Sequence, residues 1–219
     1  MQVMLRQLNL LMENNIYLYG ASGHCKVVID ILRANQEKIT AIIDDNPKTK
    51  ELLAVPVIHS AEFVADSIQK LIVSIGDNEI RKKIVTKIKG SFYTAIHPKA
   101  IVSSFSKVRE GSMVMAGAII NVDVVVGKHC IVNTGAIIEH DCVIENYVHL
   151  SPNATLSGNV LVKEGAHIGA GACVIQGVTI GKWATIGAGA VIIRDVPDYA
   201  VVVGNPGRVI KSKNKRDNE

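Results

Sequence analysis

Hydrophobic residues in the second half of the chain recur at every sixth position. From Ile96 to Ile192 each sixth residue is Val, Ile or Leu, which gives seventeen consecutive matches in the 219-residue sequence. Four positions after each of them stands a small or slim residue, from Ala100 to Val196. A six-residue unit with one large and one small inward position suits a triangular coil, in which each unit forms one short strand and one corner.

Three such units complete a coil, so equivalent positions of successive coils stack about 4.8 Å apart along its axis. We therefore predict a left-handed parallel β-helix over residues 95–204. Glycines suit tight corners that tolerate few side chains, and four fall where such corners are expected: Gly127, Gly169, Gly181 and Gly187. The flat sides of such a prism commonly pack in threes, so fold analogy predicts a homotrimer.

Before the repeat, strands alternate with helices. Three short apolar runs are expected to be strands, at Ile16–Tyr19, Thr40–Ile43 and Leu71–Ile75. Glycine-containing turns lead from the first and third strands into helices with one apolar face. These faces carry Val27, Val28, Ile31 and Leu32 in the first helix, and Ile80, Ile84, Val85 and Ile88 in the second. The alternation predicts a small parallel α/β domain of Rossmann-like type.

The carboxyl ends of these strands carry groups suited to a nucleotide. Parallel strands end at one edge of their sheet, where open α/β folds bind ligands. The turn Gly20–His24 offers backbone N–H groups at a helix N-terminus, which suit a phosphate. Asp44 and Asp45 follow the second strand and suit a ribose or a base. The turn lacks the third glycine of the dinucleotide fingerprint, so alone it is a weak signal, and a tight turn without a ligand is the alternative.

Composition and charge exclude several classes of protein. Aromatic residues make up only 4% of the chain, as expected for a narrow core of Val, Ile, Ala and Gly. The net charge is +4, and the segment from Arg208 to the end carries +3 of it, with five Lys or Arg against two acidic residues. No basic stripe remains to bind nucleic acid. No apolar run is long enough for a membrane span and no signal peptide is evident, so we expect a cytoplasmic protein.

The four cysteines have no zinc-ligand spacing, so no metal is expected. Cys130 and Cys142 fall on small inward positions of the repeat and should be buried.

Seven segments of the chain resemble a known family of enzymes. They are YGASGHCKVVID, IIDDN, SIGDNEIRKK, IVNTGAIIEHDCVI, NYVHLSPNATLSGNV, IGAGA and VVGNPGRVI, between Ile16 and Ile210. In these segments the chain resembles bacterial nucleotide-sugar N-acetyltransferases of the sialic-acid O-acetyltransferase-like group. The resemblance implies transfer of an acetyl group from acetyl-CoA to the 4-amino group of a UDP-linked 4-amino-4,6-dideoxy sugar, as in bacillosamine synthesis. Gly207 stands where the family usually has Ala.

The resemblance also implies the roles of individual residues. The residues that would hold the UDP-sugar are Ser22, Gly23, His24, Asp44, Asp45 and Gly76. His140 would be the general base, Asp141 would support its basicity, and Asn133 would lie beside the reacting amine. The residues that would line the acetyl-CoA groove are His149, Ala170 and Ala188. The implied assembly is a homotrimer with active sites between subunits.

The implied segments are an N-terminal extension at 1–14, a Rossmann-like nucleotide-sugar-binding domain at 15–94, the β-helix acyltransferase domain at 95–204, and a C-terminal segment with a basic tail at 205–219. The tail is expected to be solvated, with contact to cofactor phosphates as the alternative.

His140 stands two residues after the inward Ile138, at a corner that should face outward. A neutral imidazole is a suitable base near pH 7, and it would take a proton from the sugar amine as the nitrogen attacks the thioester. Cys142 should point inward, so a covalent acyl-enzyme is not expected. A backbone N–H or the His149 imidazole would stabilise the oxyanion. Three other histidines are interpreted as structural: His97, His129 and His167.

Other functions remain open. The same base and groove would serve O-acetylation of a sialic acid or N-acetylation of a GDP-linked amino sugar. A zinc enzyme resembling γ-carbonic anhydrase would need three histidines from adjoining subunits, and His140 and His149 are spaced differently from that family's closer pair. A β-helix scaffold with a ligand-sensing domain is the non-enzymatic alternative.

Overall fold

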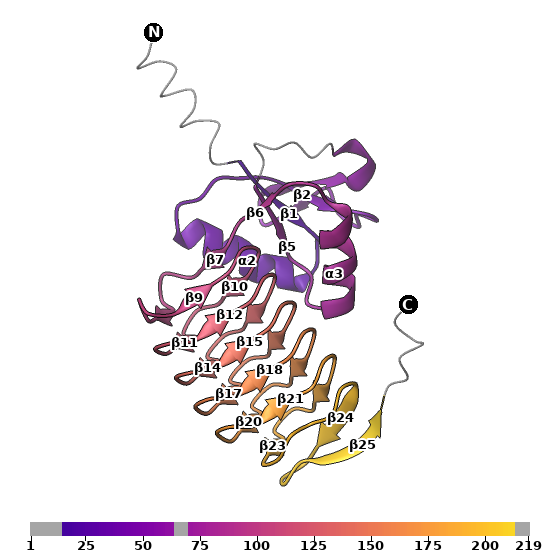
Figure 1. Ribbon diagram of the computed structural model, residues 1–219. Helices are drawn as coiled ribbons and strands as arrows, with labels where there is room; N and C mark the ends of the chain where they lie inside the picture. Colours follow the sequence, from indigo (N-terminus) through magenta and orange to yellow (C-terminus); the bar gives the residue numbers. More distant parts are fainter. Residues whose placement is uncertain (1–14, 64–69, 213–219) are drawn as a thin grey trace.

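The computed structural model describes residues 15–63 and 70–212. The predicted extension at 1–14 and residues 213–219 of the basic tail lie outside these ranges. Figure 1 shows an α/β domain placed at one end of a β-helix. The predicted fold class, an α/β domain followed by a β-helix of hexapeptide repeats, is confirmed. β6 ends at Phe92 and β7 begins at Ala95, while the domain limits given above stay a prediction.

The α/β domain is built on a six-stranded sheet. Its strands, in order across the sheet, are β3 (Glu51–Leu52), β4 (Val55–His59), β2 (Ile39–Asp44), β1 (Ile16–Tyr19), β5 (Lys70–Val73) and β6 (Ser91–Phe92). Its helices are α2 (Gly23–Ala34), the 3-10 helix η1 (Ser60–Glu62) and α3 (Asn78–Lys87).

The three predicted strands are found as β1, β2 and β5, but the expectation of a wholly parallel sheet is wrong at one edge. β3 pairs antiparallel with β4, whereas the other neighbours in this sheet are parallel. Leu53 and Ala54 join the two edge strands with positive φ angles of 50° and 57°. Such left-handed pairs form the two-residue turn of a tight hairpin, and neither residue is the Gly or Asn that would have announced it.

The helices bury different faces from those predicted. In α2, Val28, Ile31 and Leu32 are buried as expected, but Val27 is 40% exposed. In α3, Ile84 is buried while Ile80 is 49% exposed. The rest of the buried face of α3 is polar. It consists of Asn78 and Arg81.

The β-helix has three sides, each a sheet built mainly of two-residue parallel strands. Side 1 contains β7 (Ala95–Ile96), β10 (Met113–Val114), β13 (Ile131–Val132), β16 (His149–Leu150), β19 (His167–Ile168), β22 (Thr185–Ile186), β24 (Ala200–Val203) and β25 (Arg208–Ser212), the last antiparallel to β24. Side 2 contains β8 (Ile101–Val102), β11 (Ile119–Ile120), β14 (Ile137–Ile138), β17 (Thr155–Leu156), β20 (Cys173–Val174) and β23 (Val191–Ile192). Side 3 contains β9 (Lys107–Val108), β12 (Val125–Val126), β15 (Val143–Ile144), β18 (Leu161–Val162) and β21 (Thr179–Ile180). We name corners by the sides they join, in chain direction: corner 1–2, corner 2–3 and corner 3–1.

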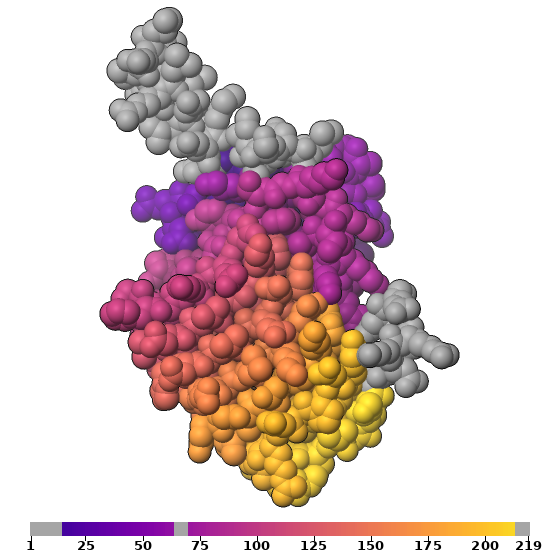
Figure 2. Space-filling view, in the orientation of Figure 1, coloured from indigo at the N-terminus to yellow at the C-terminus, as the bar shows by residue number. Residues whose placement is uncertain are grey.

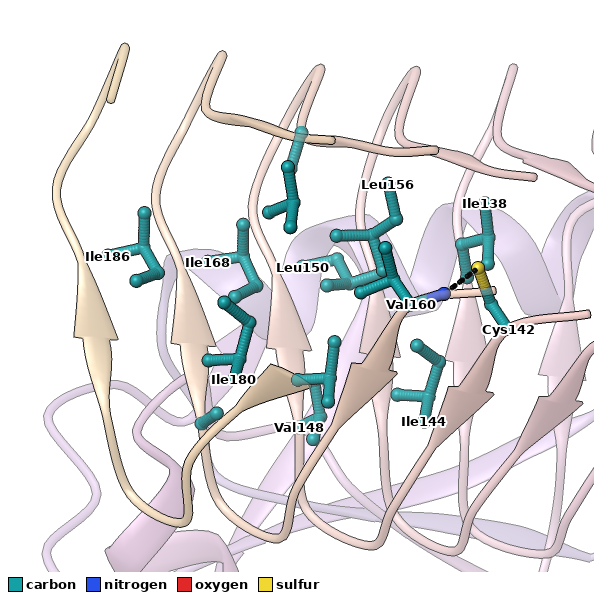
Figure 3. Close-up of a cluster of buried hydrophobic side chains, with 14 of the residues drawn as sticks. Ile138, Cys142, Ile144, Val148, Leu150, Leu156, Val160, Ile168, Ile180 and Ile186 are labelled. Carbon is teal, nitrogen blue, oxygen red and sulfur yellow. Dashed lines mark hydrogen bonds between the residues drawn. The ribbon is translucent and has the colours of Figure 1, made fainter. Parts of the chain in front are cut away.

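Both predicted inward registers form the core of the β-helix. The large positions, such as Ile138, Ile144 and Leu150, point into the coil and are fully buried, as Figure 3 shows. Cys130 and Cys142 are also fully buried, as predicted. The Cys142 Sγ accepts a hydrogen bond from the Val160 amide at 3.4 Å (Figure 3) and donates one to the Ser157 carbonyl at 3.2 Å.

The four predicted corner glycines lie where the chain approaches them closely. A Cβ added at Gly127, Gly169 or Gly181 would lie 2.7, 2.6 or 2.4 Å from the backbone of the next coil. At Gly187 it would meet a side-chain atom of Val203 at 2.7 Å. These glycines therefore let successive coils stack at their close spacing.

The α/β domain packs on side 1. Outward residues of the first strands on this side, Ala95, Met113 and Ile131, are buried in the same apolar cluster as the β1 and α2 side chains. The next residues in this register are His149 and His167, so the outward surface of side 1 becomes polar where the domain ends. In Figure 2 the two parts meet in one continuous surface.

Neither of the two α-helices in the described ranges is long and apolar enough to cross a membrane.

We expect Gly181→Ala to destabilise the protein, because its Cβ would displace the backbone of residues 197 and 198. The free energy of unfolding should fall by about 1–3 kcal/mol, the usual cost of overpacking. Gly90→Ala is the matched control, because its Cβ would have its nearest contact at 3.4 Å, on a Leu71 methyl. It should change stability by less than about 0.5 kcal/mol. Urea unfolding at one fixed protein concentration compares them, and equal midpoints would contradict the close-packed corner.

Candidate active site

The glycine turn after β1 is open to solvent at the start of α2. Ser22 occupies the N-cap of α2, yet its side chain makes no capping hydrogen bond. Ser22 and Gly23 are both exposed, and a Cβ at Gly23 would meet nothing within 4 Å. The first N–H groups of a helix have no partner within the helix, and they suit an anionic group such as a phosphate.

Asp44 ties the end of β2 to this turn. Its Oδ2 accepts from the Ala21 amide at 2.7 Å, and its Oδ1 accepts from the Asn46 amide at 2.8 Å. Asp45 is exposed, and its Oδ1 accepts from the Tyr19 hydroxyl at 2.6 Å. That hydrogen bond lowers the pKa of Asp45, so the carboxylate is ionised at neutral pH. Asp44 therefore shapes the turn, while Asp45 presents charge to solvent.

His149 lies where the loop after β5, which contains Gly76, meets side 1. Only 9% of the surface of His149 is exposed. Its Nδ1 is 3.2 Å from the Gly76 carbonyl oxygen, which requires an N–H on Nδ1. Its Nε2 is 3.2 Å from Asn133 Nδ2, which donates to it. The His24 ring lies 6.2 Å away between ring centroids. The structure thus brings four predicted site residues together, namely His149, Gly76, Asn133 and His24. Ser22 lies nearby in sequence, on the loop that starts α2.

Burial keeps these histidines neutral. It lowers the pKa of His149 to about 3 and that of His24 to about 4. Because the proton of His149 is on Nδ1, its Nε2 is an acceptor and cannot donate to an oxyanion. The interpretation of the His149 imidazole as an oxyanion donor does not fit this tautomer. The neighbouring Asn133 amide carries the N–H groups at this point.

A cleft of about 320 Å³ opens beside His149. Its lining consists of Gly76, Asp77, Asn78, Glu79, His149, Gly165, His167, Trp183 and Thr185. Ala170 and Ala188 are exposed on the adjoining corner 1–2, and they stack one coil apart, with the Gly189 amide donating to the Ala170 carbonyl at 2.8 Å. A long, flexible ligand could follow this corner towards the cleft.

His140 and Asp141 form a second group, at corner 2–3. The Nδ1 of His140 is 2.8 Å from Asp141 Oδ2, and the two side chains are 58% and 59% exposed. The hydrogen bond from the imidazole to Asp141 raises the pKa of His140 above its usual value. The ring lies over Gly158, whose added Cβ would come within 2.6 Å of His140 Cε1. A glycine one coil further on therefore leaves room for the imidazole.

The structure does not bring the two groups together within one chain. Asn133 and His140 lie at opposite ends of side 2, separated by β14. His149 follows His140 by half a coil, so it lies on side 1 while His140 lies at the corner opposite side 1. Of the predicted catalytic residues, His140 and Asp141 are in contact, and Asn133 is instead a neighbour of His149.

Two candidate functional residues, His167 and Arg81, were not predicted from the sequence. His167, interpreted as structural, stacks on His149 with ring centroids 4.8 Å apart, and its Nε2 lies 2.8 Å from Ser151 Oγ. Its position one full coil after His149 was a usable signal. Arg81, which is fully buried in α3, had no such signal. Within residues 15–63 and 70–212, no three His, Cys, Asp or Glu side chains are grouped to hold a metal ion.

The coils and the loops define a class of protein, namely hexapeptide-repeat transferases that carry an N-terminal α/β domain. Residues 15–88 match the PglD N-terminal domain, and residues 123–158 and 159–194 match the bacterial transferase hexapeptide repeats. The chain is similar to perosamine N-acetyltransferase from Caulobacter crescentus, a mutant of which was solved in complex with CoA and GDP-perosamine. That match has 40% identity, a TM-score of 0.85, and coverage of 90% of this chain and 97% of the other.

Two further relatives are also named as acetyltransferases. The acetyltransferase domain of PglB from Neisseria gonorrhoeae FA1090, solved with acetyl coenzyme A, matches with 35% identity and a TM-score of 0.84, over 90% of this chain and all of that one. UDP-N-acetylbacillosamine N-acetyltransferase from Bacillus subtilis (strain 168) is 43% identical over 113 residues, which span 47% of this chain and about half, 51%, of that relative. The chain belongs to the family of PglD-like hexapeptide-repeat sugar N-acetyltransferases.

We expect acid to destabilise the protein through its buried neutral histidines. His129 is 3% exposed, and burial lowers its pKa from 6.5 to about 4. The unfolded chain binds a proton at this site below about pH 6.5, whereas the folded protein does not until about pH 4, so stability falls across that window. The loss from this one site at pH 5 should be about 2 kcal/mol relative to pH 8.

His129→Gln should flatten the pH dependence of the free energy of unfolding between pH 6.5 and 4.5, measured by urea unfolding. The control is His140→Gln, whose exposed imidazole has a raised pKa and which should not flatten it. An identical slope in His129→Gln and the parent protein would contradict the buried neutral state.

Proposed function

We propose that this protein transfers the acetyl group of acetyl-CoA to the amino group of a nucleotide-linked amino sugar. The observation that carries the proposal is the exposed His140 imidazole, held by Asp141 at a corner of the β-helix. With Nδ1–H donating to Asp141, the Nε2 lone pair faces outward and can accept a proton. Two of the named relatives, UDP-N-acetylbacillosamine N-acetyltransferase and perosamine N-acetyltransferase, support the same reaction class.

The proposed reaction is direct. The amine nitrogen attacks the thioester carbonyl carbon, and His140 Nε2 takes the proton that the nitrogen loses. The C–S bond then breaks, the new amide remains on the sugar, and the proton on His140 passes to the departing CoA sulfur. Asp141 accepts the Nδ1–H throughout, which fixes the tautomer and stabilises the imidazolium. The buried Cys142, whose pKa is raised by burial, takes no part.

The acceptor is proposed to be the 4-amino group of a UDP-linked 4-amino-4,6-dideoxy sugar. The 43% identical relative is named as a UDP-N-acetylbacillosamine N-acetyltransferase, which supports a UDP-linked acceptor. The residues proposed to hold the nucleotide sugar are Ser22, Gly23, His24, Asp44, Asp45 and Gly76. A GDP-linked amino sugar is the second candidate, because the Caulobacter relative was solved with GDP-perosamine and aligns over 97% of its length.

Acetyl-CoA is proposed to run along corner 1–2, past Ala188 and Ala170, with its acetyl end beside His149. Both alanines are exposed and small, so a pantetheine arm can approach the backbone there. The described residues Arg208 and Lys211 are exposed on β25, at the far end of side 1, and are proposed to carry positive charge for the cofactor phosphates.

We further propose a homotrimer with active sites between subunits. His140 and the His149 group lie on opposite sides of one chain, so a single copy cannot present both to one substrate. Val122 and Val143 flank His140 and are 41% and 42% exposed, which suits coverage by a second copy. A neighbouring copy whose corner 2–3 faces this side 1 would complete the site.

We expect the protein to release CoA thiol from acetyl-CoA in the presence of a UDP-linked 4-amino sugar, and His140→Ala to lower kcat by about 10²–10⁴-fold, as loss of a general base does. A thiol-reactive dye follows the reaction, with the GDP-linked sugar as a parallel substrate. The control is Ser104→Ala, at the exposed equivalent corner position two coils earlier, which should keep kcat within about threefold of the parent. Full activity of His140→Ala would contradict the assignment of the base.

The pH profile should report the His140–Asp141 pair. Because the hydrogen bond to Asp141 raises the pKa of His140, the acidic limb of kcat/KM should move to lower pH in Asp141→Asn, with a lower plateau. Asp123→Asn, at the equivalent corner position one coil earlier and also at positive φ, is the matched control and should leave the limb in place. A limb that stays put in Asp141→Asn would rule out this pair as its source.

A further inference from the structure

Arg81 is buried completely between the α/β domain and the β-helix, and all of its hydrogen-bond donors are used. A guanidinium has five N–H groups. They bind the carbonyl oxygens of His129 (2.8 Å), Ile75 (2.9 Å), Gly76 (3.2 Å) and Tyr147 (2.9 Å), and the Asn78 Oδ1 (2.7 Å). Every one of these acceptors is an uncharged carbonyl oxygen.

Arg81 and Asn78 together bind three successive coils at corner 3–1. His129 and Tyr147, whose carbonyls Arg81 contacts, are one coil apart, and Gly165 is the next residue in that register. The Asn78 Nδ2 donates to the Gly165 carbonyl at 3.0 Å and to the Ala166 carbonyl at 3.2 Å. Corner carbonyls that point away from the coil would otherwise be buried without a partner, which is costly.

The same guanidinium also fixes the loop that follows β5. It binds the carbonyls of Ile75 and Gly76, and the Gly76 carbonyl in turn accepts the Nδ1–H of His149. A continuous set of contacts therefore leads from the coil corners through Arg81 and Gly76 to His149 and on to Asn133.

We propose that Arg81 and Asn78 are positioning residues for acetyl transfer, which hold the Gly76 loop at a fixed place on the β-helix and thereby fix the orientation and tautomer of His149. The inference rests on the proposed function in one respect: it takes the Gly76 loop as part of the acceptor site and His149 as part of the donor site. Arg81 itself contacts neither substrate, because it is wholly buried.

Other contacts already hold the two parts together, which separates positioning from simple attachment. Met113 and Ile131 bury their side chains in the core of the α/β domain. Lys82, the residue after Arg81, forms an ion pair with Glu164 at 2.5 Å. Neither of these contacts reaches residues 75 and 76, so the Arg81–Asn78 pair has a separate effect on that loop.

Lysine cannot replace this arginine. Its ammonium is a compact charge with three donors, whereas the guanidinium of Arg81 is a planar fork whose five donors all have acceptors. Arg81→Lys keeps the charge and much of the volume, so it tests geometry. Arg81→Gln, which has two donors and no buried charge, is a second variant in case the lysine form does not fold.

The kinetic test compares both Arg81 variants with Lys82→Ala, which removes an ion pair between the same helix and the same coils. In the Arg81 variants we expect KM for the nucleotide sugar to rise and kcat to fall, each by about tenfold, as misplacement of a binding loop does. KM for acetyl-CoA should stay within about twofold. Acetyl-CoA is proposed to bind along corner 1–2, which Arg81 does not contact. Lys82→Ala should lower the melting temperature without this split.

The second test reads the His149 tautomer directly by 15N NMR of histidine-labelled protein, with His149→Gln to assign its signals. The parent and Lys82→Ala should show a protonated Nδ1 and a bare Nε2, and the Arg81 variants should show a mixture of tautomers. Parent-like kinetic constants in both Arg81 variants, or an unchanged His149 tautomer in both, would overturn the proposal. If the parent itself transfers no acetyl group, the proposed function has failed, and the tautomer still decides whether Arg81 positions His149.

Discussion

The backbone hydrogen bonds between successive coils fix the place of every side chain on the β-helix. Each coil takes three hexapeptide units, so that the Ile131 amide bonds to Val148 and the His149 amide to Ala166, one coil further on. Residues one coil apart are therefore neighbours, as His149 and His167 are. Residues half a coil apart, such as His140 and His149, lie on opposite sides of the prism. The division of the candidate site into two groups follows from this spacing alone.

The α/β domain adds a second constraint, because its position decides which part of side 1 is buried. Beneath the domain the outward residues Met113 and Ile131 are apolar and belong to its core. At its rim the same register holds His149, which is buried by the Gly76 loop and kept neutral. The buried Arg81 fixes that rim by binding both the loop and the coil corners. His149 and the Gly76 loop are thus held by contacts from both domains.

The repeat could be predicted from the sequence because each unit repeats the same local requirement for one large and one small inward side chain. The burial of Cys142 and the outward position of His140 follow from counting within that register. The positions of β1, β2 and β5, although not the exact ends of β2 and β5, were predictable for a similar reason, since apolar runs and glycine turns are local signals. The His140–Asp141 contact joins adjacent residues and needed no tertiary information.

Contacts between distant segments could not be predicted in this way. The buried face of α3 is polar because it meets backbone carbonyls at corner 3–1, and nothing in its own pattern announces them. The burial of His149 depends on Gly76, 73 residues away in the sequence. The β3–β4 hairpin turns at Leu53 and Ala54, which are not typical of a left-handed turn. Each of these features arises where the two domains meet or where the backbone departs from its usual preference.

The most direct test of a site shared between copies is to co-express two inactive variants, His140→Ala and His149→Ala, with different affinity tags and to purify the mixed assemblies. If one copy supplies His140 and its neighbour supplies His149, then about one site in three of every mixed cyclic trimer, with two copies of either variant, contains both histidines. The purified mixed assemblies should regain about a third of the parent's thiol-release activity. Mixed assemblies no more active than either variant alone would contradict the shared site.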